Sequence, residues 1–177
     1  MALHSSNLRP LKRIDLLLET AARIRPRELF KLVILAGGNF APFAADVQRL
    51  ELEDRVIVRE NVLEVEDYLQ AADLGLFTSE TERVGVSSLE AMYFACPSVA
   101  TRVGGIPEVL PEYAGMLVPP CQPDVLAFAL VEACARAWDR RAIVAHAARF
   151  RWADNIKQLD IVVKKVVADR AAMGAAV

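Results

Sequence analysis

The chain alternates between short apolar segments and longer segments in which apolar residues recur with the period of a helix. The short runs are rich in β-branched residues and cover residues 32–36, 55–60, 73–79, 97–101 and 115–119. The helix-period segments between them cover residues 11–24, 42–50, 64–71, 84–95 and 107–110. Apolar strands separated by crossover helices indicate a parallel sheet that is covered on both faces. We therefore predict an α/β fold, a doubly wound parallel sheet with helices on both faces.

The last third of the chain is predicted to be helical, with no further strand. Gln122-Pro123-Asp124 places a proline at the first position of a helix that runs to about residue 137. After a break near residues 150–151, a long helix is predicted over residues 152–172, with apolar positions such as Ile156 and Leu159. A terminal helix without its own strand often packs across the edge of the sheet or onto a neighbouring domain. We treat residues 1–177 as one domain whose last helix is directed towards a partner.

Composition excludes several classes of protein. A formal charge of −2, from 21 basic and 23 acidic residues, gives no field that would attract nucleic acid. No apolar run reaches the roughly 18 residues of a membrane span, and the first residues lack the pattern of a signal peptide. Three irregularly spaced cysteines indicate a reduced, cytoplasmic protein, and two distant histidines predict no metal site. The apolar content of 54% is high for one domain and indicates a sheet covered on both faces, a surface for a partner, or both.

The segment 79–92 carries an acidic pair around the predicted start of a helix. Glu82 precedes the helix and Glu90 lies about two turns into it, while Gly85 opens it. The free amides of residues 84–87, Val84, Gly85, Val86 and Ser87, would favour an anion such as a phosphate. Carboxylates beside such a site could accept hydrogen bonds from sugar hydroxyls. The spacing alone is equally compatible with a solvated loop and helix.

Residues 5–13 place Arg9 and Lys12 between a first strand, at the very start of the chain, and the first helix. Cations there could neutralise a diphosphate, although a basic, solvated helix start explains them as well. Gly37 and Gly104-Gly105 lie in glycine turns after strands, and neither turn has the GxGxxG pattern of dinucleotide sites. Asn61 and Val62, after another strand, are candidates for backbone contacts to a nucleotide base.

Together, the segments SNLRPLKR, LVILAGGN, AADLGLFTS, ERVGVSSLEAM and TRVGGIPEVL resemble the carboxyl-terminal lobe of retaining glycosyltransferases of the group 1, sucrose-synthase-like family. The resemblance covers roughly residues 3–170 and implies the Rossmann-like donor lobe of a GT-B fold. Its E-x7-E motif corresponds to Glu82 and Glu90, which would then bind hydroxyls of the sugar and of the ribose. It also implies that Arg9 and Lys12 stabilise the leaving diphosphate, and that residues 84–87 hold sugar and diphosphate.

The chain departs from the family pattern at three points. Asn7 stands where many members have a basic residue, and Arg83-Val84 stands where an aromatic residue often precedes the glycine. The family's enzymes have two lobes and this chain has one, so the resemblance implies a missing amino-terminal, acceptor-binding lobe. The terminal helix would cross towards that lobe. Without it the chain should bind donor but barely catalyse transfer. The missing lobe could also hold the enzyme at the inner membrane face.

The implied activity is transfer of a sugar, with retention of configuration, from a nucleotide diphosphate sugar to an unknown acceptor. A UDP-sugar is the expected co-substrate, and neither a metal nor another cofactor is expected. The variant SNLRPLKR is similar to the subgroup that transfers N-acetylglucosamine to malate. Alternatives are an epimerase or phosphorylase with the same lobe, and a non-catalytic binding module. Inversion at the donor sugar, or phosphate as acceptor, would favour the second enzyme class.

Overall fold

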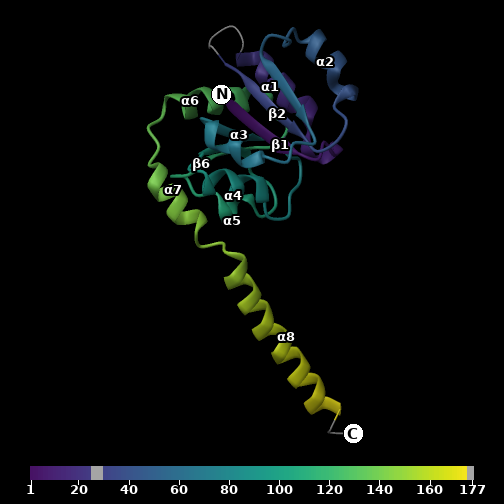
Figure 1. The fold of residues 1–177 in the computed structure, drawn as a ribbon, viewed down its shortest axis with the longest axis vertical. Helices are drawn as coiled ribbons and strands as arrows, with labels where there is room; N and C mark the ends of the chain where they lie inside the picture. The colour runs from purple at the N-terminus through teal and green to yellow at the C-terminus, as the bar shows by residue number, and fades with distance from the viewer. Residues whose placement is uncertain (25–29, 175–177) are drawn as a thin grey trace.

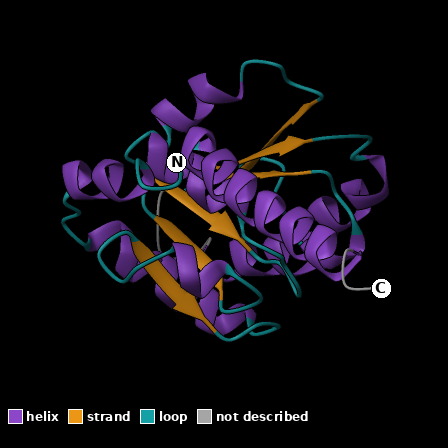
Figure 2. Ribbon diagram, turned by 90° about the horizontal axis from the view of Figure 1, so that it is seen from below, coloured by secondary structure: helices purple, strands orange, loops and turns teal. Residues whose placement is uncertain are grey.

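A six-stranded, fully parallel sheet forms the centre of the domain in the computed structural model, which describes residues 1–24 and 30–174. The strands are β1 (Ala2–Ser6), β2 (Leu32–Ala36), β3 (Val56–Glu60), β4 (Leu74–Phe77), β5 (Ser98–Thr101) and β6 (Gly115–Val118). Their spatial order is β3-β2-β1-β4-β5-β6. Helices cover both faces (Figures 1 and 2), which confirms the predicted doubly wound α/β fold.

The helices are α1 (Ile14–Ile24), α2 (Ala44–Arg49), α3 (Val65–Ala71), α4 (Val86–Tyr93), α5 (Ile106–Val109), α6 (Pro123–Ala135), α7 (Arg140–Ala147) and α8 (Trp152–Gly174). Two short 3-10 helices, η1 (Pro10–Lys12) and η2 (Ala41–Phe43), precede α1 and α2. The predicted helix over residues 11–24 is therefore wrong at its start. Arg13 adopts a positive φ of 52° and separates η1 from α1, so the basic segment forms a separate turn at the sheet edge.

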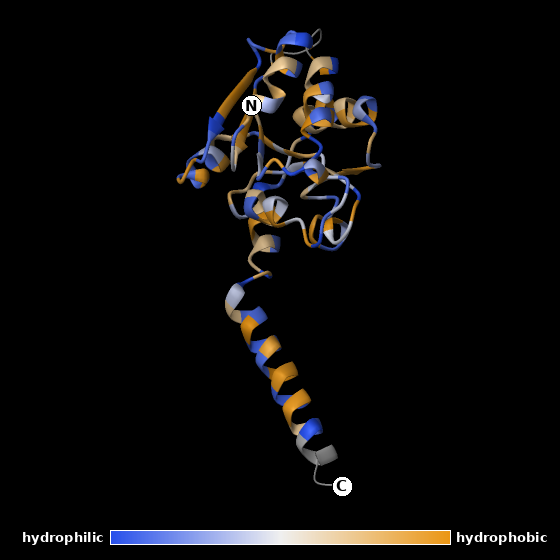
Figure 3. Cartoon of the chain, turned by 90° about the vertical axis from the view of Figure 1, so that its right-hand side faces the viewer, coloured by the Kyte–Doolittle hydropathy of each residue, from blue (hydrophilic) through white to orange (hydrophobic). Residues whose placement is uncertain are grey.

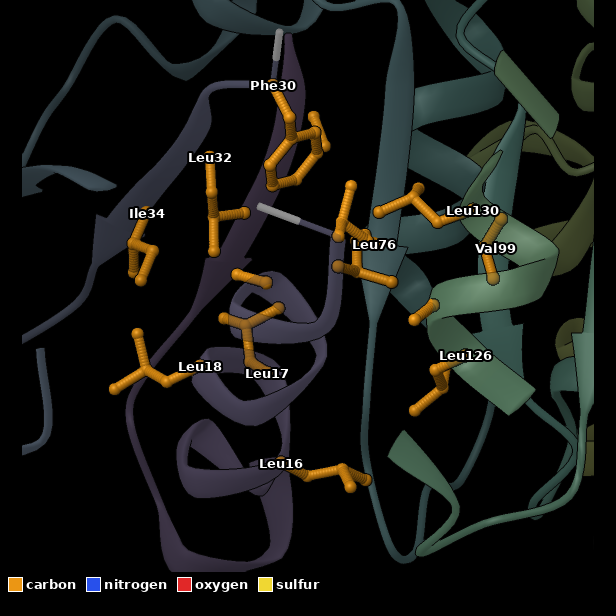
Figure 4. Close-up of a cluster of buried hydrophobic side chains, with 14 of the residues drawn as sticks. Leu16, Leu17, Leu18, Phe30, Leu32, Ile34, Leu76, Val99, Leu126 and Leu130 are labelled. Atoms are coloured by element: carbon orange, nitrogen blue, oxygen red, sulfur yellow. The ribbon is translucent and has the colours of Figure 1, made fainter. Parts of the chain in front are cut away.

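Alternate residues of each central strand enter different cores. Leu32 and Ile34 of β2 pack with the apolar sides of α1 and α6, whereas Val33 and Leu35 pack with α4, α5 and α7 on the opposite face. Figure 4 shows the first core, in which leucines of α1 meet side chains of the sheet and of α6. This alternation explains why the strands are apolar on both sides, since both of their faces are covered.

Helix α8 extends away from the rest of the domain (Figures 1 and 3). Every residue from 151 to 170 is exposed, including Trp152, Leu159 and Val163. The apolar positions recur along the helix at intervals of three and four residues, as in a helix that packs on another surface. Among the described residues, no helix is long and apolar enough to cross a membrane.

Helix α7 is not among the elements that the spacing of apolar residues predicts. Asp139 caps this helix, because its carboxylate accepts hydrogen bonds from the backbone amides of Arg141 and Ala142 at 3.1 and 3.0 Å. Ile143 and Ala147 of its inner side are buried in the same core as Ala91 and Met92 of α4. An aspartate followed by residues of high helix propensity was the available signal.

Candidate functional site

The strand order places a topological switch point between β1 and β4. The chain leaves β1 towards β2 on one side, and the later strands β4, β5 and β6 lie on the other side. In open α/β sheets, ligands bind beyond the carboxyl ends of the strands at such a point, because the two following loops diverge there. In this chain those loops are residues 7–13 and 78–85, which contain the basic and the acidic motifs.

Backbone and hydroxyl hydrogen bonds join these two loops. The amide of Glu80 donates to the carbonyl of Leu11 at 2.8 Å, and the Thr78 hydroxyl donates to the carbonyl of Lys12 at 2.9 Å. The segments are about 70 residues apart in sequence, so their contact depends on the pairing of β1 with β4. The two motifs therefore form one site.

Lys12 and Glu82 form an ion pair at the centre of this site. The Ser79 hydroxyl donates to the same Glu82 oxygen, Oε1, at 3.1 Å. Each of the two charged side chains is only 18% exposed, so the pair is shielded from solvent more than an ordinary surface ion pair. An open hollow of about 600 Å³ lies next to the ion pair. It is lined by both members of the pair and by Asn7, Arg9, Leu11, Thr81 and Arg83.

Helix α4 begins beside this pair, at Gly85. The glycine has φ 79° and ψ 48°, and a Cβ at this position would lie 2.7 Å from Cγ1 of Ile106. None of the described side chains caps the helix, so its first amides keep the unpaired N–H groups that attract an anion. Val84 and Val86 are exposed here, and the Ser87 hydroxyl donates to the carbonyl of Ser5 at 3.3 Å, which fixes the helix start over the end of β1.

Gly104 and Gly105 pack closely against the backbone of the acidic loop. A Cβ on Gly104 would lie 1.6 Å from the carbonyl oxygen of Glu82, and one on Gly105 would lie 2.4 Å from that of Arg83. The amide of Gly105 donates to the Arg83 carbonyl at 2.9 Å. The glycine turn thus does more than reverse the chain, since it allows the Glu82 backbone to approach.

His4, which the sequence analysis did not select, lies beneath the site in β1 and is 1% exposed. Its Nδ1 is 2.8 Å from the carbonyl of Leu76, which can only accept, so Nδ1 carries the proton of the neutral ring. Nε2 then accepts from the Ser6 hydroxyl at 2.9 Å, and Ser6 Oγ in turn accepts the Leu8 amide at 3.4 Å. Burial lowers the pKa of His4 to about 4, and the charge of Lys12 acts in the same direction.

Ser88, on α4, also lies under the site. Its hydroxyl is buried, and the described residues give it no hydrogen-bond partner. It lines a small cavity with His4, Ser79 and Glu82, among other residues of the two loops. Polar side chains therefore continue from the open hollow into the domain.

The remaining predicted residues lie further out. Glu90 follows on α4 with its side chain partly exposed, and desolvation raises its pKa above the ordinary value. Gly37 donates its amide to the Ser6 carbonyl at 2.8 Å, next to the basic loop. Asn61 has a positive φ of 51° after β3, and Val62 packs partly into the second core. The described contacts do not join Asn61 or Val62 to the Lys12–Glu82 pair.

A second cavity, of about 290 Å³, lies at the opposite, amino-terminal edge of the sheet. Its lining includes Met1, Asp73, Arg136, Trp138 and Arg140. It is remote from the loops that follow the strands. Among the described residues, no group of three or more histidine, cysteine or carboxylate side chains is arranged to hold a metal ion.

An open parallel sheet with charged loops at its switch point defines a class of ligand-binding α/β domains, and the family follows from comparison with known proteins. Residues 1–136 match the family described as glycosyl transferases group 1, and the chain belongs to this family. The N-acetyl-alpha-D-glucosaminyl L-malate synthase of Bacillus anthracis is 38% identical over 61% of the chain and 29% of that enzyme. A D-inositol 3-phosphate glycosyltransferase of Kineococcus radiotolerans is 33% identical over 93% of the chain and 44% of that enzyme.

Solved structures share the fold. Sucrose-phosphate synthase from Thermosynechococcus elongatus superposes with a TM-score of 0.81 and 24% identity, covering 95% of this chain and 46% of that one. Anabaena HepE in complex with UDP and glucose has a TM-score of 0.80 and 24% identity, covering 93% and 48%. The chain thus has the Rossmann-like fold of one lobe of GT-B glycosyltransferases, and it spans less than half the length of these relatives.

Proposed function

We propose that this domain is the donor-binding lobe of a retaining glycosyltransferase that uses a nucleotide diphosphate sugar. The observation that carries the proposal is the meeting of Lys12, Glu82 and the uncapped start of α4 at the switch point. A cation and helix amides suit a diphosphate, and a carboxylate beside them suits the hydroxyls of an attached sugar. One site would therefore recognise both halves of the donor.

Each residue has a role that fits its position. Lys12, and Arg9 on the rim of the hollow, would neutralise the diphosphate as it leaves, together with the amides of residues 84–87. Glu82 would accept hydrogen bonds from the transferred sugar. Glu90 lies about one turn after the start of α4 at Val86, not two turns as expected from the sequence, and would accept them from the ribose. Gly37, Asn61 and Val62, at the ends of β2 and β3, would contact the base through their backbones.

We expect UDP as the nucleotide. The structural neighbour HepE was solved with UDP and glucose, and its fold matches this chain over 93% of the length. We assign no residue of the proposed site the role of a covalent nucleophile. Lys12, Arg9 and the amides of residues 84–87 would instead stabilise the negative charge that develops on the departing diphosphate, which is electrostatic stabilisation of the transition state.

Catalysis would also require a second, acceptor-binding lobe. The chain covers 44% of the glycosyltransferase of Kineococcus radiotolerans, which leaves room for such a lobe in the relative. Helix α8 carries exposed apolar residues along most of its length, including Ile156, Leu159 and Val163. Apolar patches of this kind mark protein interfaces. We propose that α8 packs against the second lobe, and that the lobe in isolation binds donor without efficient transfer.

The proposal is tested by calorimetric titration of the domain with UDP, GDP and ADP. UDP should bind most tightly, and Glu90→Ala should weaken UDP binding about tenfold, because a hydrogen bond between a hydroxyl and a charged group is lost. The penalty should shrink with 2′-deoxyuridine diphosphate, which lacks one of the hydroxyls. Glu132→Ala, an exposed glutamate on α6, serves as the control. Absence of nucleotide binding up to millimolar concentration would disprove the proposal.

A further inference from the structure

The Lys12–Glu82 ion pair joins the two residues to which the proposed function gives separate tasks. Lys12 would bind the diphosphate and Glu82 the sugar, yet in the free domain each binds the other. Ser79 holds the same carboxylate oxygen at 3.1 Å, so Glu82 is positioned towards Lys12 by a second contact. Arg9 is exposed, and among the described residues it has no ion-pair partner.

A diphosphate at Lys12 therefore competes with Glu82. The ammonium charge is already neutralised by the carboxylate, and a diphosphate beside it would bring further negative charge close to Glu82. The pair is mostly shielded from water, so solvent screens this repulsion less than at an open surface. An attached sugar would offset this repulsion. Its hydroxyls can donate hydrogen bonds to Glu82 and replace the one that Lys12 donates in the free domain.

We propose that Glu82 acts as an electrostatic gate that weakens the binding of a nucleotide diphosphate without a sugar and thereby favours the intact donor. This inference rests on the proposed function. It gives Glu82 a task beyond recognition of the sugar, since the same carboxylate would help to expel the nucleotide product after transfer. Binding of the donor would open the ion pair, and release of the product would restore it.

The test is calorimetry of the domain with UDP, UDP-glucose and UDP-N-acetylglucosamine. Glu82→Gln keeps the size of the side chain and one acceptor oxygen, replaces the other oxygen with an NH2 group, and removes the negative charge. It should tighten UDP binding about threefold or more, the range expected for freeing one partner of a partly exposed ion pair. The ratio of UDP-sugar affinity to UDP affinity should fall for whichever sugar nucleotide the wild type binds more tightly.

Glu80→Gln is the matched control, because Glu80 lies in the same loop but contacts Arg13, at 3.5 Å, instead of Lys12. It removes the same charge two residues away and should leave the affinity ratio unchanged. If Glu82→Gln binds UDP no more tightly than Glu80→Gln does, the gate is refuted. Lys12→Met separates this result from failure of the proposed function. If the wild type binds no UDP, or binds it as well as Lys12→Met does, the site assignment itself is wrong.

Discussion

The buried histidine beneath the site makes the stability of the domain depend on pH. The pKa of His4 is about 4 in the folded protein, compared with 6.5 for an unperturbed histidine. The unfolded chain therefore binds more protons than the folded one between these values, and stability falls as the pH decreases from about 6.5 towards 4. Between pH 7 and pH 4.5 the loss from His4 alone should be about 2.5 kcal/mol.

Urea unfolding at pH 7 and at pH 4.5 measures this contribution when wild type is compared with His4→Asn. The asparagine does not titrate, so the variant should lose about 2.5 kcal/mol less than wild type over the same interval. Asp15, whose pKa is lowered by its hydrogen bond with Arg13, and Glu90, whose pKa is raised by desolvation, titrate in both proteins, so their effects cancel in the comparison.

Val99→Ala is the control, because it lowers the stability of the domain but leaves the titration of His4 in place. Val99 is fully buried in the sheet, and its truncation should lower the free energy of unfolding by a similar amount at both pH values. Equal losses between pH 7 and pH 4.5 for wild type and His4→Asn would refute the assignment of His4 as a neutral, buried ring.

Two further predictions concern the support of the site and the terminal helix. Gly104→Ala should lower the free energy of unfolding by about 2–4 kcal/mol and weaken UDP binding, because its Cβ would overlap the Glu82 carbonyl; unchanged thermal unfolding and calorimetry would contradict this. Ending the chain after Arg151 should remove helical circular dichroism while shifting the melting temperature by less than about 2 °C, since residues 151–170 are exposed. A larger decrease would show that α8 packs on this domain.

The fold could be predicted because the inner strands β2, β4 and β5 are buried on both faces. Alternate residues of a central strand pack into different cores, as Leu32 and Val33 of β2 do. The sequence of such a strand is therefore a continuous apolar run, which differs clearly from the periodic pattern of a helix. The sequence predicts the starts of the helices less accurately than the strands. Arg13 adopts a left-handed conformation that the helical spacing of residues 11–24 does not reveal, and α7 depends on a single capping aspartate.

The candidate site could be predicted only in parts. The sequence identifies Lys12 and Glu82 as separate candidates, but their ion pair requires β1 to lie next to β4, and local patterns do not determine strand order. His4 lies in an apolar strand and has no spacing signal, because its partners, the Leu76 carbonyl and Ser6, include a backbone group 72 residues away. From the sequence, Gly104 indicates only a turn. The close approach of the Glu82 carbonyl in the structure shows why no side chain fits at this position.

The central claim is that a nucleotide diphosphate binds at the carboxyl-terminal edge of β1 and β4. Its most direct test is to follow backbone amide resonances of the isotopically labelled domain during titration with UDP. The account predicts that the largest shifts occur in residues 84–87 and in the loop that contains Arg9 and Lys12, because the start of α4 and the ion pair line the same small cavity. Shifts centred on the opposite cavity, around Asp73, Arg136 and Arg140, or no shifts at all, would contradict it.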